Sequence, residues 1–148
     1  MFLKFRPRTE SEMKMRLSKL GFSAETVEQV LADFKAKGLV NDEKFARYFA
    51  EREMSAKPSG RRAIIANLKA KGVPAEMAVQ AAEQVSEGKG DLEVARELAH
   101  KKVSSFRGLE PEVVRRRLFG FLGRRGFPAD VVYKVVREST GKDSGEIE

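Results

Sequence analysis

The residues of this sequence with the clearest chemical potential are the arginines and lysines towards its carboxyl end. Residues 101–137 carry ten Lys and Arg against three Asp and Glu, whereas residues 1–100 carry 18 against 15. Arginine forks bind phosphates and carboxylates equally well, so this excess indicates a polyanionic or acidic partner. The candidate binding residues are Arg61, Arg62, Lys69, Lys71, Lys101, Lys102, Arg107, Arg115, Arg116, Arg117, Arg124 and Arg125. Their spacing does not choose between DNA phosphates and an acidic protein surface, and a solvated basic surface without a partner is a third interpretation.

Residues suited to catalysis or metal binding are few. The single histidine, His100, precedes Lys101 and Lys102 and lacks a partner of recognisable spacing, which favours an ordinary surface histidine. Asp42 and Asp91 recur at matching positions, and helix capping explains both. The sequence has no cysteine, no glycine-rich phosphate loop and no histidine cluster with metal spacing. It therefore predicts no enzyme, no metal and no cofactor, and a nuclease in particular would need clustered carboxylates.

The elements that must position the basic residues belong to a motif that the sequence repeats three times. An apolar residue stands four positions before a glycine, and an apolar residue, Ser or Pro, Ala and an acid follow the glycine directly. The copies lie at 17–31, 68–82 and 122–136. The glycine can take the left-handed conformation that ends a helix, and Ser or Pro with the acid suits the first turn of the next helix. Each copy predicts a helix, a sharp turn and a second helix.

A second pattern extends the repeat to three helices. Asp-x-x-apolar-Ala-Arg-x-apolar-Ala occurs at 42–50 and again at 91–99. Stripes such as Met13, Leu17 and Leu20 mark the inner faces of the helices. We predict an all-α fold, an elongated, curved array of tandem three-helix repeats, in which the third repeat lacks its last helix. The single domain is 1–138, its units are about 11–58, 59–108 and 111–138, and the polar residues 139–148 are expected to be disordered.

The helix expected before the third glycine carries much of the basic patch. Arg117 and Arg124 are seven residues apart and share one flank of that helix, while Arg116 points almost opposite the core. Phe121 and Phe127 could stack on bases, but their positions on the apolar stripe favour core packing.

Composition and length set the remaining limits. The chain has 148 residues and 41% apolar residues, enough for a modest core. No segment approaches the roughly 18 apolar residues of a membrane span, and the opening residues are too short for a secretory signal. The absence of cysteine fits a reducing compartment. We therefore expect a soluble, cytoplasmic protein, monomeric and without a membrane partner.

Several segments, taken in order, resemble the family of the bacterial regulatory protein RecX. They are Arg6-Pro7-Arg8-Thr9-Glu10-Ser11-Glu12-Met13, Gly38-Leu39-Val40-Asn41-Asp42-Glu43-Lys44-Phe45-Ala46, Gly60 with Leu68-Lys69-Ala70-Lys71-Gly72-Val73, and Arg124-Arg125-Gly126-Phe127. The likeness runs to about residue 138, and order and spacing carry it more than any single motif. In one departure, family members usually begin with a full helix before the Arg-Pro-Arg segment, so we expect that helix to be short or missing here.

The resemblance implies a helical-repeat protein that binds the filament of the recombinase RecA and contacts its DNA, single-stranded within the filament or directly. Family members restrain filament growth or promote disassembly, and so dampen ATP hydrolysis, strand exchange and RecA-stimulated repressor cleavage, which places them in DNA repair and the SOS response. The alternative from the residues alone is a stand-alone basic helical module that binds nucleic acid, with steep salt dependence and no effect on RecA turnover. A structural scaffold is a third possibility.

Overall fold

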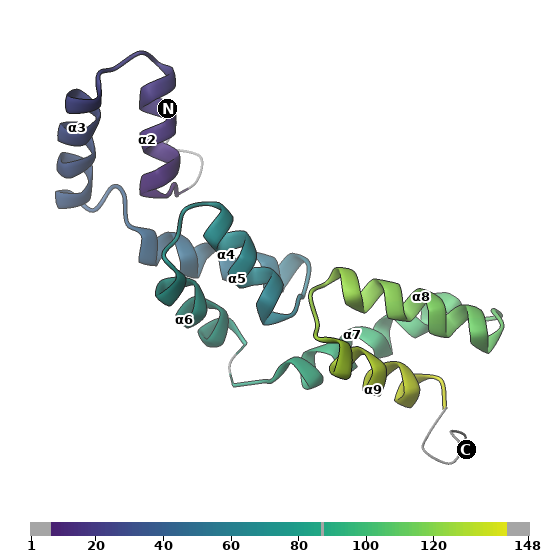
Figure 1. Cartoon of the computed structure of the whole chain (residues 1–148). Coiled ribbons are helices and arrows are strands. Elements are labelled where there is room, and N and C mark those ends of the chain that lie inside the picture. Colours follow the sequence, from purple (N-terminus) through teal and green to yellow (C-terminus); the bar gives the residue numbers. More distant parts are fainter. Residues whose placement is uncertain (1–6, 87, 142–148) are drawn as a thin grey trace. The chain divides into compact units, whose positions relative to one another are not determined.

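The structure, a computed structural model, describes residues 7–86 and 88–141, and within these ranges every regular element is a helix (Figure 1). The elements are α2 (Glu10–Lys19), α3 (Ala24–Ala36), α4 (Asp42–Ala56), α5 (Arg61–Ala70), α6 (Ala75–Val85), α7 (Asp91–Val103), the 3-10 helix η1 (Ser104–Phe106), α8 (Pro111–Arg124) and α9 (Ala129–Ser139). The predicted all-α class is confirmed. Residues 1–6, where the sequence predicts a short or missing helix, and 142–148 of the expected disordered tail lie outside the described residues.

The helices form two compact units. Unit 1 comprises Met1–Arg52 and Ile64–Val85, and unit 2 comprises Glu53–Ala63 and Ser86–Glu148. The chain passes from one unit to the other inside α4, inside α5 and again after α6. The predicted repeat boundaries at 58 and 108 group the same helices differently from these two compact units. A series of three-helix repeats can be divided at any of its helices, so these boundaries stay a prediction. Across the described ranges, no helix is both long and apolar enough to cross a bilayer.

The repeated glycine motif ends a helix in all three copies, as predicted. Gly21, Gly72 and Gly126 have φ angles of 96°, 96° and 85°, in the region that favours glycine. The amide three residues past the last helical residue donates back to a carbonyl five residues earlier, the bond that closes a helix of this kind. These bonds are Phe22 N to Leu17 O (3.3 Å), Val73 N to Leu68 O (3.0 Å) and Phe127 N to Leu122 O (3.4 Å).

Each unit has an apolar core drawn from the predicted stripes. In unit 1, Met13 packs with buried residues of α3 and the turn after it, with Leu17 half-buried beside them. Leu20 departs from the prediction, because it follows α2 as its C-cap and is 59% exposed. In unit 2 the core joins α7, η1, α8 and α9, through Val94, Ala95, Ala99, Phe106, Leu118, Leu122, Phe127, Val132, Val135 and Val136.

In each unit the start of one helix rests on a copy of the glycine turn. In unit 1 the hydroxyl of Thr9, which is fully buried, donates to the carbonyl oxygen of Lys71 at 2.7 Å and accepts from the amide of Glu12 at 3.0 Å. In unit 2 the amide of Gly60 donates to the carbonyl oxygen of Arg125, also at 2.7 Å. We call these two contacts the repeat junctions, because matching parts of the repeat meet in both.

At two of the three motif positions, the close contact at the junction requires glycine in addition to the positive φ angle. A Cβ atom at Gly72 would lie 2.3 Å from the Cβ of Ser11, and one at Gly126 would lie 2.5 Å from the Cβ of Ala63. Real Cβ atoms do not approach so closely, so a side chain at either position would force the junction apart. At Gly21 no described atom lies within 4 Å of the same position. There the positive φ alone favours glycine.

The repeated aspartates do cap helices, but not the helices that their sequence position suggests. The side chain of Asn41, not Asp42, accepts from the α4 amide of Lys44 at 3.0 Å. Asp42 accepts instead from the first amide of α2, Glu10 N, at 2.9 Å. Asp91 accepts from the first amide of α5, Arg61 N, at 3.1 Å. The repeat aspartate therefore ties the first helix of each predicted unit to the third.

A candidate partner-binding surface on α7, α8 and α9

Helix α8 carries the densest part of the predicted basic patch and is held by its neighbours on two sides. It packs against α7 and α9, which lie beside it in Figure 1. Leu118 and Leu122, one turn apart, are fully buried and fix which face of α8 points inwards. Arg116, Arg117 and Arg124 are consequently left on the solvent side, as the sequence predicts.

A cleft with four cations runs along one side of α8. Its volume is about 340 Å³. We call it the basic cleft; its lining residues are Lys102, Phe106, Arg116, Arg117, Gly120, Phe121 and Arg124. No carboxylate is among these lining residues. Four positive charges around one hollow create a potential that attracts an anion such as a phosphate.

Aromatic rings hold one of these cations in place. The Nζ of Lys102 lies 4.9 Å from the ring centroid of Phe121 and 5.9 Å from that of Phe106. Such cation–π contacts favour a fixed ammonium position without neutralising its charge. Phe127 is buried, as its place on the apolar stripe predicts, whereas Phe121 is half-buried and lines the cleft. Phe121 therefore serves both the interior and the surface.

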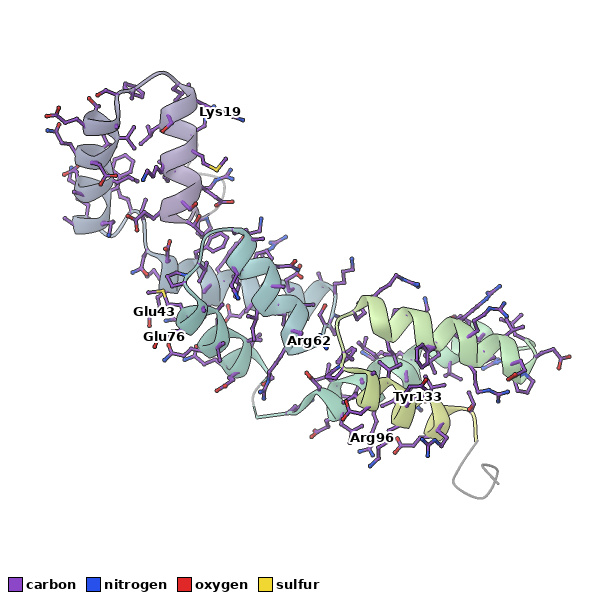
Figure 2. The ribbon with its side chains drawn as sticks, in the orientation of Figure 1. Lys19, Glu43, Arg62, Glu76, Arg96 and Tyr133 are labelled. Atoms are coloured by element: carbon purple, nitrogen blue, oxygen red, sulfur yellow. The ribbon has the colours of Figure 1, made fainter. Side chains whose placement is uncertain are left out.

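A second hollow, of about 550 Å³, lies on the other side of α8, between it and α9. We call it the apolar groove; its lining residues are Glu112, Arg115, Arg116, Phe119, Gly120, Tyr133, Val136 and Arg137. The rings of Phe119 and Tyr133 meet edge to face with centroids 5.0 Å apart, and Tyr133 is labelled on α9 in Figure 2. Arg115 forms an ion pair with Glu112 at the rim. The groove combines aromatic side chains and arginines with a carboxylate, whereas no carboxylate lines the basic cleft.

Gly120 lines both hollows from the middle of α8. A glycine inside a helix costs about 0.5–1 kcal/mol relative to alanine. Packing within the protein does not explain it, because a Cβ there would meet only the flexible end of Arg124, with Nη1 at 3.0 Å. Its effect is to leave the outer surface of α8 shallow. A partner can therefore approach the helix backbone closely between Arg116 and Arg124.

Two of the predicted binding residues, Arg125 and Lys71, contact other parts of the chain through their charged groups, and a third, Arg61, is half-buried. The guanidinium of Arg125 donates to the carbonyl oxygen of Pro58 at 2.6 Å and lies 4.7 Å from the centroid of Phe121. Arg61 is half-buried at the start of α5. Lys71 is half-buried too, with its Nζ 5.5 Å from the ring centroid of Phe49.

The other predicted residues outside the basic cleft are more accessible. Arg62, Lys69, Lys101 and Arg107 are exposed, whereas Arg115 is partly buried beside the apolar groove. Lys69 and Lys71 belong to unit 1, whereas the remaining ten predicted residues belong to unit 2. The structure thus brings Lys102, Arg116, Arg117 and Arg124 together in one cleft. A binding role for any of the twelve stays a prediction.

The single histidine lies on the surface of α7. His100 lines a shallow hollow with Arg96 and Glu138, and these two form a two-bond ion pair, both N–O distances being 2.9 Å. The hydrogen bond and charge of Arg96 lower the pKa of the Glu138 carboxyl. Within the described ranges, no group of three or more His, Cys, Asp or Glu side chains is placed to hold a metal ion. The Arg96–Glu138 ion pair in this hollow is therefore interpreted as structural.

Sequence reasoning missed the residues of the apolar groove that are not basic. Phe119 and Tyr133 each stand beside the apolar stripe of their helix, and both are exposed. Gly120 was not singled out, although it stands inside a helix pattern where glycine is unfavourable. Aromatic residues off the stripe and a glycine within a helix are signals that could have identified this groove.

Three models of the RecX family match the chain in order. The first three-helix domain of RecX matches residues 2–34, the second matches 41–81 and the third matches 90–136. These matches confirm the predicted three-helix repeats. The crystal structure of RecX from Lactobacillus salivarius has a TM-score of 0.74 and 20% sequence identity, and the alignment covers 93% of this chain and 89% of that one. At this identity the likeness shows a shared fold.

Two relatives of similar sequence are regulatory proteins RecX. The regulatory protein RecX of Amycolatopsis mediterranei is 37% identical over 136 residues, which span 92% of this chain and 77% of the relative. That of Streptomyces coelicolor is 32% identical over 142 residues, spanning 96% and 75%. Because the likeness covers most of both chains and the three domain models follow one another in the expected order, this chain belongs to the RecX family of regulatory proteins.

Proposed function

We propose that this protein binds the filament of the recombinase RecA and restrains its assembly, ATP hydrolysis, strand exchange and stimulation of repressor cleavage. Membership of the RecX family supports a regulatory role towards RecA. The observation that carries the proposal on this chain is the basic cleft, in which four cations and no carboxylate line one hollow on α8. The protein acts by binding and needs no chemistry of its own.

The basic cleft is suited to the phosphates of DNA within the filament. Lysine and arginine neutralise phosphates and release counterions, which makes binding weaken as salt rises. If each of the four cations holds one phosphate of a single strand, the slope of log affinity against log salt is about −0.7 per phosphate, and affinity falls about 50-fold between about 50 and about 200 mM salt. Gly120 supports this assignment, because it leaves room for a sugar–phosphate chain against α8.

A repeat protein on a filament gains from contacting several identical subunits. Once one unit is bound, the other is held near its own site at high effective concentration, so weak contacts multiply. We therefore expect affinity for the filament to exceed affinity for a free subunit by about 100-fold or more.

The test is RecA-dependent ATP hydrolysis on single-stranded DNA with this protein titrated in. The wild type should inhibit turnover, and the triple variant Arg116→Glu, Arg117→Glu and Arg124→Glu should inhibit much less at equal concentration. A matched variant, Lys44→Glu, Arg47→Glu and Lys134→Glu, makes the same change of charge at exposed positions outside the cleft and should inhibit like the wild type.

Circular dichroism should show equal helicity in all these proteins. Undiminished inhibition by the cleft variant would remove the cleft from the mechanism. Tight, salt-sensitive binding to bare single strands without any effect of the wild type on RecA turnover would instead support the stand-alone nucleic-acid-binding module.

A further inference from the structure

The three copies of the glycine turn have very different surroundings. The apolar residue directly after the glycine is Phe22 in the first copy, Val73 in the second and Phe127 in the third. Val73 is 3% exposed and Phe127 is 5% exposed, whereas Phe22 is 51% exposed. The helix end and backbone conformation are the same in all three. The difference therefore comes from what covers the turn.

The amino-terminal end of a helix covers the second and third turns. At the second turn Thr9, the N-cap of α2, donates its hydroxyl to the carbonyl oxygen of Lys71. At the third turn the amide of Gly60, just before α5, donates to the carbonyl oxygen of Arg125. A small residue in the first turn of the covering helix, Ser11 or Ala63, then lies against the glycine. In both covered copies, therefore, the glycine turn packs against the amino-terminal end of a helix.

The first turn is more apolar than the two that are covered. Its residue before the glycine is Leu20, 59% exposed, where the covered copies have Lys71 and Arg125. Terminal repeats of repeat proteins normally carry a polar outer face for solubility. The two large apolar side chains exposed at this turn, Leu20 and Phe22, depart from that rule, and contiguous exposed apolar surface is a feature of interaction sites.

We propose that the turn Leu20-Gly21-Phe22 is a docking site for the amino-terminal end of a helix on the protein subunits of the filament, a proposal that rests on the function proposed above. The matching helix end would present Ser, Thr or Gly at its N-cap and a small residue in its first turn, as α2 and α5 do. Arg16 and Lys19, exposed in the last turn of α2, complement the acidic residues favoured in a first turn (Lys19 is labelled in Figure 2).

This site is separate in chemistry from the basic cleft. The cleft presents cations to phosphates, whereas the turn presents two exposed apolar side chains to a polypeptide. The two surfaces belong to different units of the chain, unit 2 and unit 1. A protein that reads both the DNA and the protein of a filament gains selectivity for the filament over either component alone.

The test compares the double variant Leu20→Ser/Phe22→Ser with the single variant Leu39→Ser. Leu39 is 52% exposed at the turn after α3 in the same unit, so its replacement removes an exposed apolar side chain of similar exposure outside the junction motif. Binding is measured by interferometry on RecA filaments assembled on single-stranded DNA with a slowly hydrolysed ATP analogue, and in parallel on bare single-stranded DNA. The double variant should bind filaments at least about 10-fold more weakly, and bare DNA unchanged; Leu39→Ser should change neither.

The controls separate this proposal from the one on which it rests. Absence of filament binding by the wild type would overturn both. Equal filament binding by wild type and double variant would overturn the docking site alone. If the double variant lowers the melting temperature as much as Phe127→Ser does, the chain itself covers the turn. If the wild type is a dimer and the double variant is a monomer, a second copy covers the turn. Either result would also overturn the proposal.

Discussion

Replacing a single motif glycine by alanine should have very different effects in the first and third copies of the repeat. Gly21 and Gly126 share the same place in the motif, and both have φ in the positive region, 96° and 85°. They differ in their surroundings, because nothing described lies within 4 Å of a Cβ at Gly21, whereas one at Gly126 would lie 2.5 Å from the Cβ of Ala63 and 3.0 Å from its amide nitrogen. Comparing the two variants therefore separates the cost of backbone strain from the cost of disrupting the repeat junction.

The magnitudes can be worked from these two environments. Alanine at positive φ costs about 1–2 kcal/mol, and the smaller entropy of its unfolded chain returns about 0.4–1 kcal/mol, so Gly21→Ala should cost about 1 kcal/mol. At Gly126 the overlap with Ala63 adds about 1–3 kcal/mol. Displacement of α5 also weakens the bond from Gly60 to the carbonyl oxygen of Arg125, which adds about 0.5–1.5 kcal/mol. Gly126→Ala should therefore cost about 3–5 kcal/mol.

Thermal unfolding followed by far-ultraviolet circular dichroism measures both variants. At roughly 4 °C per kcal/mol for a chain of this size, Gly21→Ala should lower the melting temperature by about 4 °C and Gly126→Ala by about 12–20 °C. Hydrogen exchange adds a local readout, because the Gly60 amide should lose protection in Gly126→Ala and keep it in Gly21→Ala. Equal losses of stability in the two variants, or a Gly60 amide that stays protected, would refute the argument that the junction and not the turn itself demands glycine.

Two further predictions concern polar contacts. Thr9→Val should cost about 2 kcal/mol in urea unfolding, because it removes a helix cap and leaves the carbonyl oxygen of Lys71 without its buried donor, while Thr9→Ser should retain most of the stability; equal losses would contradict this. Arg96 lowers the pKa of Glu138, so the ionised carboxylate stabilises the folded protein slightly above pH 4.5, and this stability is lost as the pH falls through the lowered pKa of the folded state. Glu138→Gln should therefore flatten this part of the dependence of unfolding free energy on pH. An unchanged pH dependence would count against a stabilising role of the Arg96–Glu138 pair.

The candidate site illustrates how far residue spacing can be taken. The seven-residue interval between Arg117 and Arg124 correctly places both on the solvent side of α8, because helix geometry relates residues close in sequence. Lys102 joins the same cleft only because α7 packs beside α8, and the length and path of the connecting segment do not follow from periodicity. Arg125, adjacent to Arg124, is held instead by the carbonyl oxygen of Pro58, 67 residues earlier in the chain.

The sequence by itself determined the helical class, the three glycine turns and the family, since each depends on short-range periodicity, helix ends and the order of motifs. Only the tertiary structure decided that Asp42 and Asp91 cap the first amides of α2 and α5, and that Leu20 lies outside the core. The physical reason is the same throughout. Local patterns specify which side chains a helix can bury, but the approach of residues far apart in the chain decides which of them are actually covered.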